Sequence, residues 1–236
     1  YGRFGVSCVC NLTGRSSPTQ IPGTTWSKLG KSQGGYGAWF AHKTDGTLWA
    51  WGYNDEGGLG QNNTTKYSSP VQVGSDTTWS SSINMFAVRN HGCYAIKTDG
   101  TLWTWGAGSN GGLGHNNDTA YSSPTQIGTD TDWKALSNSG YQGSMAVLKT
   151  DGTRWVTGGW NRYGWFGDGT EDQKISSPVQ IGSNTDWEWF SGNAGRKTDG
   201  TIWVWGSNNY GNLGQNDTTQ RSSPVQLPGT DWHKTQ

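Results

Sequence analysis

The stretch KTDGT at residues 43–47 decides the fold, because the same five residues return at 97–101, 149–153 and 197–201. A second phrase, Ser-Ser-Pro, keeps step with the first. Its copies end at Pro18, Pro70, Pro124, Pro178 and Pro224, at intervals of 52, 54, 54 and 46 residues. Two markers that recur in one phase predict that the chain is an array of a single structural unit.

We interpret residues 1–236 as one continuous repeat array without a linker. The expected boundaries are a partial unit at 1–15, full units at 16–67, 68–121, 122–175 and 176–221, and a partial unit at 222–236. Both ends therefore cut through a repeat. We expect a segment of a longer chain rather than a ring closed by its own terminal strands.

Each unit reads as four short β-strands. In the second unit, Ser-Ser-Pro at 68–70 opens the first strand, where the missing amide donor of proline is tolerated. Residues 93–97 and 102–105 flank an Asp-Gly turn that suits a tight antiparallel hairpin. The Asp recurs in all four hairpins, so we interpret it as part of the turn. The pattern predicts an all-β fold, a β-propeller of four-stranded antiparallel blades.

Tryptophan supplies the expected core. Only 31% of the residues are hydrophobic, but 16 are Trp, and 38 are Gly. Twelve of the tryptophans keep fixed places in the repeat, which predicts burial, because each indole can cover a large apolar area. The four that break the register are Trp39, Trp160, Trp165 and Trp189.

A family resemblance rests on the hairpin and the loop after it. The sequence DGTLWAWG at 45–52 is followed by Asn54 and by Gly-Leu-Gly at 58–60, and the same elements recur in order at 103–114 and 203–214. This pattern resembles the repeat of the regulator of chromosome condensation family and implies a β-propeller. The phrases also resemble repeats of bacteriophage and bacterial surface proteins.

Two copies depart from the pattern. The third replaces the second hairpin Trp by Thr157 and inserts a residue. The fourth has only ten residues from Trp187 to Lys197, so we expect it to lose most of one strand. The resemblance also implies a His before each hairpin, where this chain has Ala38, Gly92, Ser144 and Gly192.

The divergent third copy supplies the candidate binding surface. Trp160, Arg162, Tyr163 and Trp165 lie together in a Gly-rich loop. Aromatic and Arg side chains are enriched in protein-binding patches, and aromatic rings also stack on sugars, so protein partners or surface glycans are the expected ligands. The alternative is that these rings fill an irregular blade from within.

Several functions are disfavoured by composition. Lys plus Arg equals Asp plus Glu at 17 each, which disfavours nucleic-acid and anionic-lipid partners, and no apolar run reaches the length of a membrane span. The four His accompany no nucleophile or metal-ligand pattern, so we expect no catalytic residue, cofactor or metal. Asp168, Glu171 and Asp172 lack the spacing of a calcium loop.

Two further local features have structural interpretations. Asn-rich loops such as 62–65 contain glycosylation sequons, but their recurrence with the repeat favours turn formation. Cys8 and Cys10 lie too close to bridge each other, which leaves free thiols or one disulfide to Cys93.

We therefore expect a non-enzymatic propeller for attachment or recognition, in an extracellular or virion setting such as a phage tail, fibre or capsid, within a larger complex. The alternative is an intracellular regulator or nucleotide-exchange-type interaction protein, although the basic tails and acidic wedge loop of such a factor are absent. An enzyme is the third class, and it has no supporting constellation.

Overall fold

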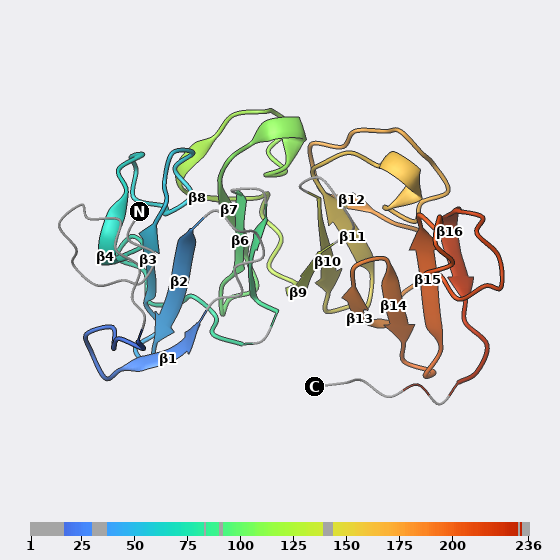
Figure 1. Ribbon diagram of the computed structural model, residues 1–236, viewed down its shortest axis with the longest axis horizontal. Helices are drawn as coiled ribbons and strands as arrows, with labels where there is room; N and C mark the ends of the chain where they lie inside the picture. Colours follow the sequence, from blue (N-terminus) through green and yellow to red (C-terminus); the bar gives the residue numbers. More distant parts are fainter. Residues whose placement is uncertain are drawn as a thin grey trace. The chain divides into compact units, whose positions relative to one another are not determined.

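The computed structural model describes residues 17–29, 37–82, 84–89, 92–138, 144–230 and 232 (Figure 1). The strands of these residues form four antiparallel sheets of four strands each, which we call the first to fourth blades. The chain divides into two compact units. The first unit (1–108 and 119–131) holds the first two blades, and the second unit (109–118 and 132–236) holds the other two.

Within each blade, the strands lie side by side in the order in which they occur along the chain. The first blade contains β1 (Trp26–Leu29), β2 (Ala38–Lys43), β3 (Leu48–Gly52) and β4 (Tyr67–Gln72). The second contains β5 (Phe86–Arg89), β6 (Gly92–Ile96), β7 (Leu102–Gly106) and β8 (Tyr121–Gln126). The third contains β9 (Trp133–Asn138), β10 (Met145–Lys149), β11 (Arg154–Thr157) and β12 (Val179–Gln180). The fourth contains β13 (Trp187–Ser191), β14 (Ala194–Lys197), β15 (Ile202–Gly206) and β16 (Arg221–Gln226). Two short 3-10 helices, η1 (Ser109–Gly111) and η2 (Arg162–Gly164), follow β7 and β11.

The KTDGT phrase forms the hairpin between the second and third strands of each blade. Gly46 has a φ of +81°, a left-handed backbone that favours glycine, and a Cβ there would collide with the carbonyl oxygen of Thr77. The Asp45 carboxylate accepts hydrogen bonds from the Thr47 amide and hydroxyl, at 3.0 and 2.6 Å. The same two bonds recur at Asp99, Asp151 and Asp199. The interpretation of this Asp as a turn residue is confirmed.

The Lys of the phrase lies between two indole rings. In the second blade, Lys97 Nζ is 4.8 Å from the ring centroid of Trp79 and 3.6 Å from that of Trp103. The ammonium also forms an ion pair with Asp76. A cation between two ring faces is attracted by their quadrupoles, more strongly when it is shielded from water. The repeat phrase thus encodes both a turn and a caged cation.

Three of the loops that follow a Gly-x-Leu-Gly element or its equivalent are hydrogen-bonded to a Ser-Ser-Pro phrase. In the first unit, the Asn62 amide donates to the Ser122 carbonyl over 2.7 Å. In the second, Asn116 and Gly169 donate in the same way to Ser176 and Ser222. Asn62 and Asn116 have φ values of 56° and 59°, a conformation that Asn tolerates in turns. The turn interpretation of the Asn-rich loops is confirmed.

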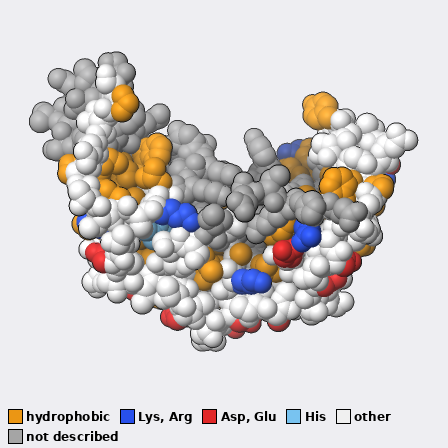
Figure 2. Space-filling view, turned by 90° about the horizontal axis from the view of Figure 1, so that it is seen from below, with side chains coloured by type: hydrophobic (Ala, Val, Ile, Leu, Met, Phe, Trp, Pro, Cys, Tyr) orange, Lys and Arg blue, Asp and Glu red, His pale blue; other side chains and the backbone are white. Residues whose placement is uncertain are grey.

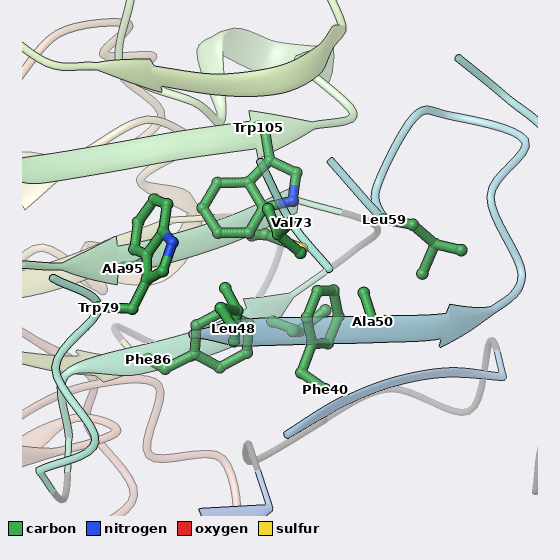
Figure 3. Close-up of a cluster of buried hydrophobic side chains, with 11 residues drawn as sticks. Phe40, Leu48, Ala50, Leu59, Val73, Trp79, Phe86, Ala95 and Trp105 are labelled. Atoms are coloured by element: carbon green, nitrogen blue, oxygen red, sulfur yellow. The ribbon is translucent and has the colours of Figure 1, made fainter. Parts of the chain in front are cut away.

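The interface between the first two blades is aromatic (Figure 3). Phe40, fully buried in β2, packs 4.8 Å from the ring of Phe86 and 6.4 Å from the ring of Trp105. Leu48 and Leu59 join the same buried cluster. The indole Nε1 of Trp105 donates to the Gly58 carbonyl over 2.9 Å, which satisfies its polar atom inside the core.

The interface between the third and fourth blades contains a guanidinium instead. Arg154 is 1% exposed and stands where the first blade has Leu48, while Ala146 stands where it has Phe40. The Arg154 guanidinium lies 4.5 Å from the ring of Trp205 and 5.3 Å from that of Phe190. One nitrogen donates to the Phe166 carbonyl, and the other two have no hydrogen-bond partner among the described residues. Burial lowers the pKa of Arg154 to about 9.

The Ser-Ser-Pro strand differs from its expected place. It is the fourth strand of the preceding blade, as in the pairing of Trp49 in β3 with Gln72 in β4, and not the first strand of a new one. A periodic sequence has no intrinsic first strand, so only the pairing fixes where a sheet begins. Each blade therefore contains strands from two consecutive sequence repeats.

The expected loss of a strand from the fourth copy is wrong, because β13 to β16 form a complete four-stranded sheet. The shortening is absorbed by a tight turn at Gly192 and Asn193 between β13 and β14. The reduced strand is β12 of the third blade, which keeps only two residues. Its pairing to β11 survives, Trp155 with Gln180 and Val156 with Val179.

The prediction of core positions holds for half of the twelve repeat-locked tryptophans. Six are at most 5% exposed: Trp51, Trp79, Trp105, Trp133, Trp187 and Trp205. Five others are half-buried around the caged lysines: Trp26, Trp49, Trp103, Trp155 and Trp203. Trp232 is 41% exposed, so core placement is wrong for it. Cys93 is a buried free thiol, whereas Cys8 and Cys10 lie outside the described residues.

Candidate functional site

The loop after β11 in the third blade is the site to which the sequence points. One inserted residue separates the strand from the Asn-x-x-Gly element, and the backbone continues through Gly158 and Gly159. Trp160 forms an isolated bridge to Lys174, and the Ile175 amide donates to the Gly159 carbonyl over 3.2 Å. The two ends of the loop are thus held together, which gives the intervening residues a defined base.

A buried asparagine fixes the loop from below. The Asn161 side chain is fully buried, its amide group donates to the Thr170 carbonyl, and its oxygen accepts from the Phe166 amide over 2.8 Å. Asn54 and Asn208 make equivalent bonds in the first and fourth blades. Because each buried polar atom is satisfied, this side chain organises a loop that has little regular secondary structure.

Three of the predicted residues form a stack on this base. The Arg162 guanidinium lies 5.1 Å from the Tyr163 ring centroid, and the Tyr163 ring meets the Trp165 ring edge to face at 5.5 Å. The Trp165 carbonyl accepts a hydrogen bond from Trp205 Nε1 over 2.9 Å. The stack is therefore attached to the core of the fourth blade.

The Tyr163 backbone is unusual. Its φ is 64° and its ψ is 28°, a left-handed conformation that is rare for a bulky residue. Such strain persists only when the surroundings hold it, and it is concentrated at functional sites. In the second blade Asn110 holds the same position with a φ of 59°, and Asn adopts this conformation more easily.

The four predicted residues differ in exposure. Trp160 is 40% exposed, Arg162 is exposed and Tyr163 is half-buried, so these three can reach a partner. Trp165 is only 9% exposed and supports the others from within the blade. Of the other two tryptophans out of register, Trp39 is 37% exposed and Trp189 is half-buried.

Tyr210 was missed by sequence reasoning. It stands in the fourth blade at the position that Tyr163 holds in the third, and 95% of it is exposed. The signal was present in the sequence, because aligning the Gly-x-Leu-Gly elements places Tyr163 and Tyr210 together, against Glu56 and Asn110 in the other copies.

The charges near the loop are mixed. Lys174 forms an ion pair with Asp118 at 2.9 Å, and this contact together with the Gly111 amide lowers the pKa of Asp118. Arg162 has no ion-pair partner among the described residues. On the face drawn in Figure 2, acidic and basic side chains both appear and neither sign covers the described part. Arg162 is therefore available to an external anion.

The described residues contain no cluster of metal-binding side chains. No group of three His, Cys, Asp or Glu side chains there could hold a metal ion. His42 is 2% exposed, and burial, followed by the charge of Lys28, lowers its pKa to about 4. In this part of the chain no helix has the length and apolar character that crossing a membrane requires.

The family model described as "Regulator of chromosome condensation (RCC1) repeat" matches residues 45–88, 99–147 and 199–234, which together exceed half of the chain. The chain belongs to the RCC1 repeat family. The expected resemblance is confirmed at the level of the repeat. The RCC1 match begins within the KTDGT hairpin, the element that the structure shows in every blade.

Among the relatives, the human E3 ubiquitin-protein ligase HERC2 is 29% identical over 203 residues, which are 82% of this chain and 4% of HERC2. The ultraviolet-B receptor UVR8 of Arabidopsis thaliana is 28% identical over 80% of this chain and 44% of its own length. The chain thus spans less than half of either RCC1 relative.

Among solved structures, Prp20p of Saccharomyces cerevisiae superimposes with a TM-score of 0.72 at 14% identity, over 92% of this chain and 54% of Prp20p. At this identity the likeness concerns the fold alone. The four four-stranded antiparallel sheets are blades of an RCC1-type β-propeller, and the predicted fold class is confirmed.

Proposed function

We propose that this chain is a non-enzymatic RCC1-type propeller module that binds a protein partner through the loop of the third blade. The observation that carries the proposal is the stack of Arg162 on Tyr163, with Tyr163 in a strained backbone and Arg162 without an ion-pair partner among the described residues. Arg, Tyr and Trp dominate the energetics of protein interfaces, above all where they are held rigidly before binding.

The relatives favour a regulator over an attachment protein. They include a ubiquitin ligase and a light receptor, and yeast Prp20p, which shares the fold, binds Gsp1p and histones. The virion or cell-surface role expected from the sequence has no counterpart among the relatives named above. We therefore place the intracellular regulator, the alternative drawn from the sequence, ahead of it, and glycans behind proteins as the ligand.

Photochemical crosslinking tests the surface. A photoreactive amino acid at position 162 should capture a partner polypeptide that mass spectrometry identifies. The same amino acid at position 56, an exposed site in the equivalent loop of the first blade, should not capture it. Equal capture from both positions would show that this loop is not the interface.

The affinity of the captured partner then tests the stack. Tyr163→Asn keeps a residue that suits the left-handed backbone, as Asn110 does, and removes the ring. We expect affinity to fall roughly tenfold, which corresponds to about 1.4 kcal/mol, with no loss of melting temperature. Trp165→Ala is the structural control, because it should lower the melting temperature. An unchanged affinity for Tyr163→Asn would refute the proposed role of the stack.

A further inference from the structure

The four lysine cages are not equal. Lys97, Lys149 and Lys197 lie between two indoles, and each also forms an ion pair with an aspartate of its own blade: Asp76, Asp132 and Asp186. In the first blade, Lys43 Nζ lies 3.6 Å from the ring centroid of Trp49 and 5.0 Å from that of Trp26. The rings are in place, and no carboxylate of the described residues pairs with this ammonium.

The sequence explains the missing carboxylate. Asp132 and Asp186 directly precede the first Trp of their blades, whereas Thr25 holds that place in the first blade. The two residues before it, Gly23 and Thr24, carry no carboxylate either. Asp45 is nearby, as its counterparts are in every blade, but its oxygen is engaged by Thr47.

The first cage is also open. Lys97, Lys149 and Lys197 are 7–8% exposed, and the Trp residues before them are at most 5% exposed. Lys43 and Trp26 are both half-buried, and Thr24 and Thr25 beside them are exposed. The indole Nε1 of Trp26 donates to the Pro22 carbonyl over 3.1 Å, which holds this ring in place.

Local charge points to an anionic partner. The first 44 residues contain five basic residues and no acidic one, so the zero net charge of the chain conceals a basic segment that includes Lys28 and Lys43. The Lys28 ammonium, in β1 next to the strand of Lys43, donates to the uncharged Ser81 carbonyl over 2.9 Å. Uncompensated charge of one sign raises the local concentration of the opposite sign.

We propose that the Lys43 cage binds a carboxylate of a protein partner, the side chain of an Asp or Glu in an acidic segment. The incoming carboxylate takes the place that an aspartate of the same blade holds in the other three. Because the three internal counterparts are carboxylates paired with caged lysines, the site matches an acidic peptide better than a phosphate. The site lies in the first unit and does not rest on the function proposed for the third-blade loop.

Peptide titration tests the site. The probe is a fluorescent peptide of alternating Glu and Gly, with blocked ends, and its Gln counterpart is the control. We expect the Glu peptide to bind, its affinity to fall as salt is raised, and the Gln peptide not to bind. Lys43→Met should weaken binding about fivefold, as expected for an ion pair worth about 1 kcal/mol. Equal binding of the two peptides would overturn the proposal.

A gain-of-carboxylate variant separates binding from stability. Thr25→Asp installs the aspartate that the third and fourth blades carry, so it should block the Glu peptide while raising the melting temperature, and the neutral Thr25→Asn should bind normally. Lys97→Met should lower the melting temperature without changing binding. If Thr25→Asp folds and still binds the peptide, the cage is not the site. If inorganic phosphate displaces the peptide at lower concentration than acetate does, the site recognises phosphate and the proposal fails.

Discussion

The two units solve the same packing problem with different chemistry. In the first, the benzyl ring of Phe40 fills the space against Phe86 and Trp105. In the second, the guanidinium of Arg154 lies against the equivalent rings of Phe190 and Trp205. The aromatic rings in both units accept a flat group, because ring faces attract cations as well as other rings. An aromatic core of this kind tolerates a buried charge that an aliphatic core would not.

Removal of Trp105, whose equivalent in the second unit is Trp205, should have the largest effect. Trp105→Ala deletes a fully buried indole that contacts Phe40, Phe86 and Trp79. We expect a loss of about 3–5 kcal/mol in the free energy of unfolding, measured by urea denaturation. The exposed Trp160 is the control, and its change to Ala should cost less than about 0.5 kcal/mol. A small effect at Trp105 would mean that the two blades do not pack as described.

Substitution of Arg154 should break the second interface alone. Arg154→Ala leaves a cavity between Phe190 and Trp205, and we expect it to cost about 2–4 kcal/mol. The pair Ala146→Phe and Arg154→Leu copies the first interface and keeps the core volume. It should stay within about 1.5 kcal/mol of the parent, because it also removes the desolvated charge. If the pair is as damaging as Arg154→Ala, the two interfaces are not interchangeable.

Acidification should distinguish the interfaces through His42, whose counterpart in the third blade is Leu148. The pKa of His42 in the folded protein is about 4, below its ordinary value of 6.5, so the unfolded chain binds the proton first. The contribution of neutral His42 to the free energy of unfolding is therefore fully present above about pH 6.5. This contribution falls by about 3 kcal/mol as the pH is lowered toward 4.

Urea denaturation between pH 7.5 and 4.5 checks this dependence. His42→Leu, which copies Leu148, should flatten the pH profile in that window, because the group that takes up the proton is gone. A profile that is equally steep in the variant would assign the proton uptake to other groups, of which the half-buried His115, with its lowered pKa, is the first to test.

Most of the fold could be predicted from the repeat. KTDGT specified its hairpin because Asp, Gly and Thr act on one another within five residues, as the Asp45 and Thr47 bonds show. The blade that the Ser-Ser-Pro strand joins could not be predicted in the same way, because the partner of Gln72 is Trp49, more than twenty residues away. The shortened fourth copy was misjudged for a related reason, since a deletion can remove a loop or a strand.

The candidate site was found only in part. Departure from the repeat located Trp160, Arg162 and Tyr163, but composition could not tell an exposed ring from a supporting one. Trp165 lies next to Phe166, and its exposure depends on the neighbouring blade, where Trp205 donates to its carbonyl. The twelve tryptophans in register were likewise divided into core, cage and surface by packing that the sequence does not display.

Local sequence alone determined the repeat, its turns and the antiparallel hairpins, because these depend on interactions between residues a few positions apart. Tertiary structure alone decided which strands share a sheet, and that the Arg154 guanidinium takes the place of the Phe40 ring although Arg154 stands at the sequence position of Leu48. Those outcomes depend on which side chains come into contact within a blade or between blades, and burial sets the free energy of each contact.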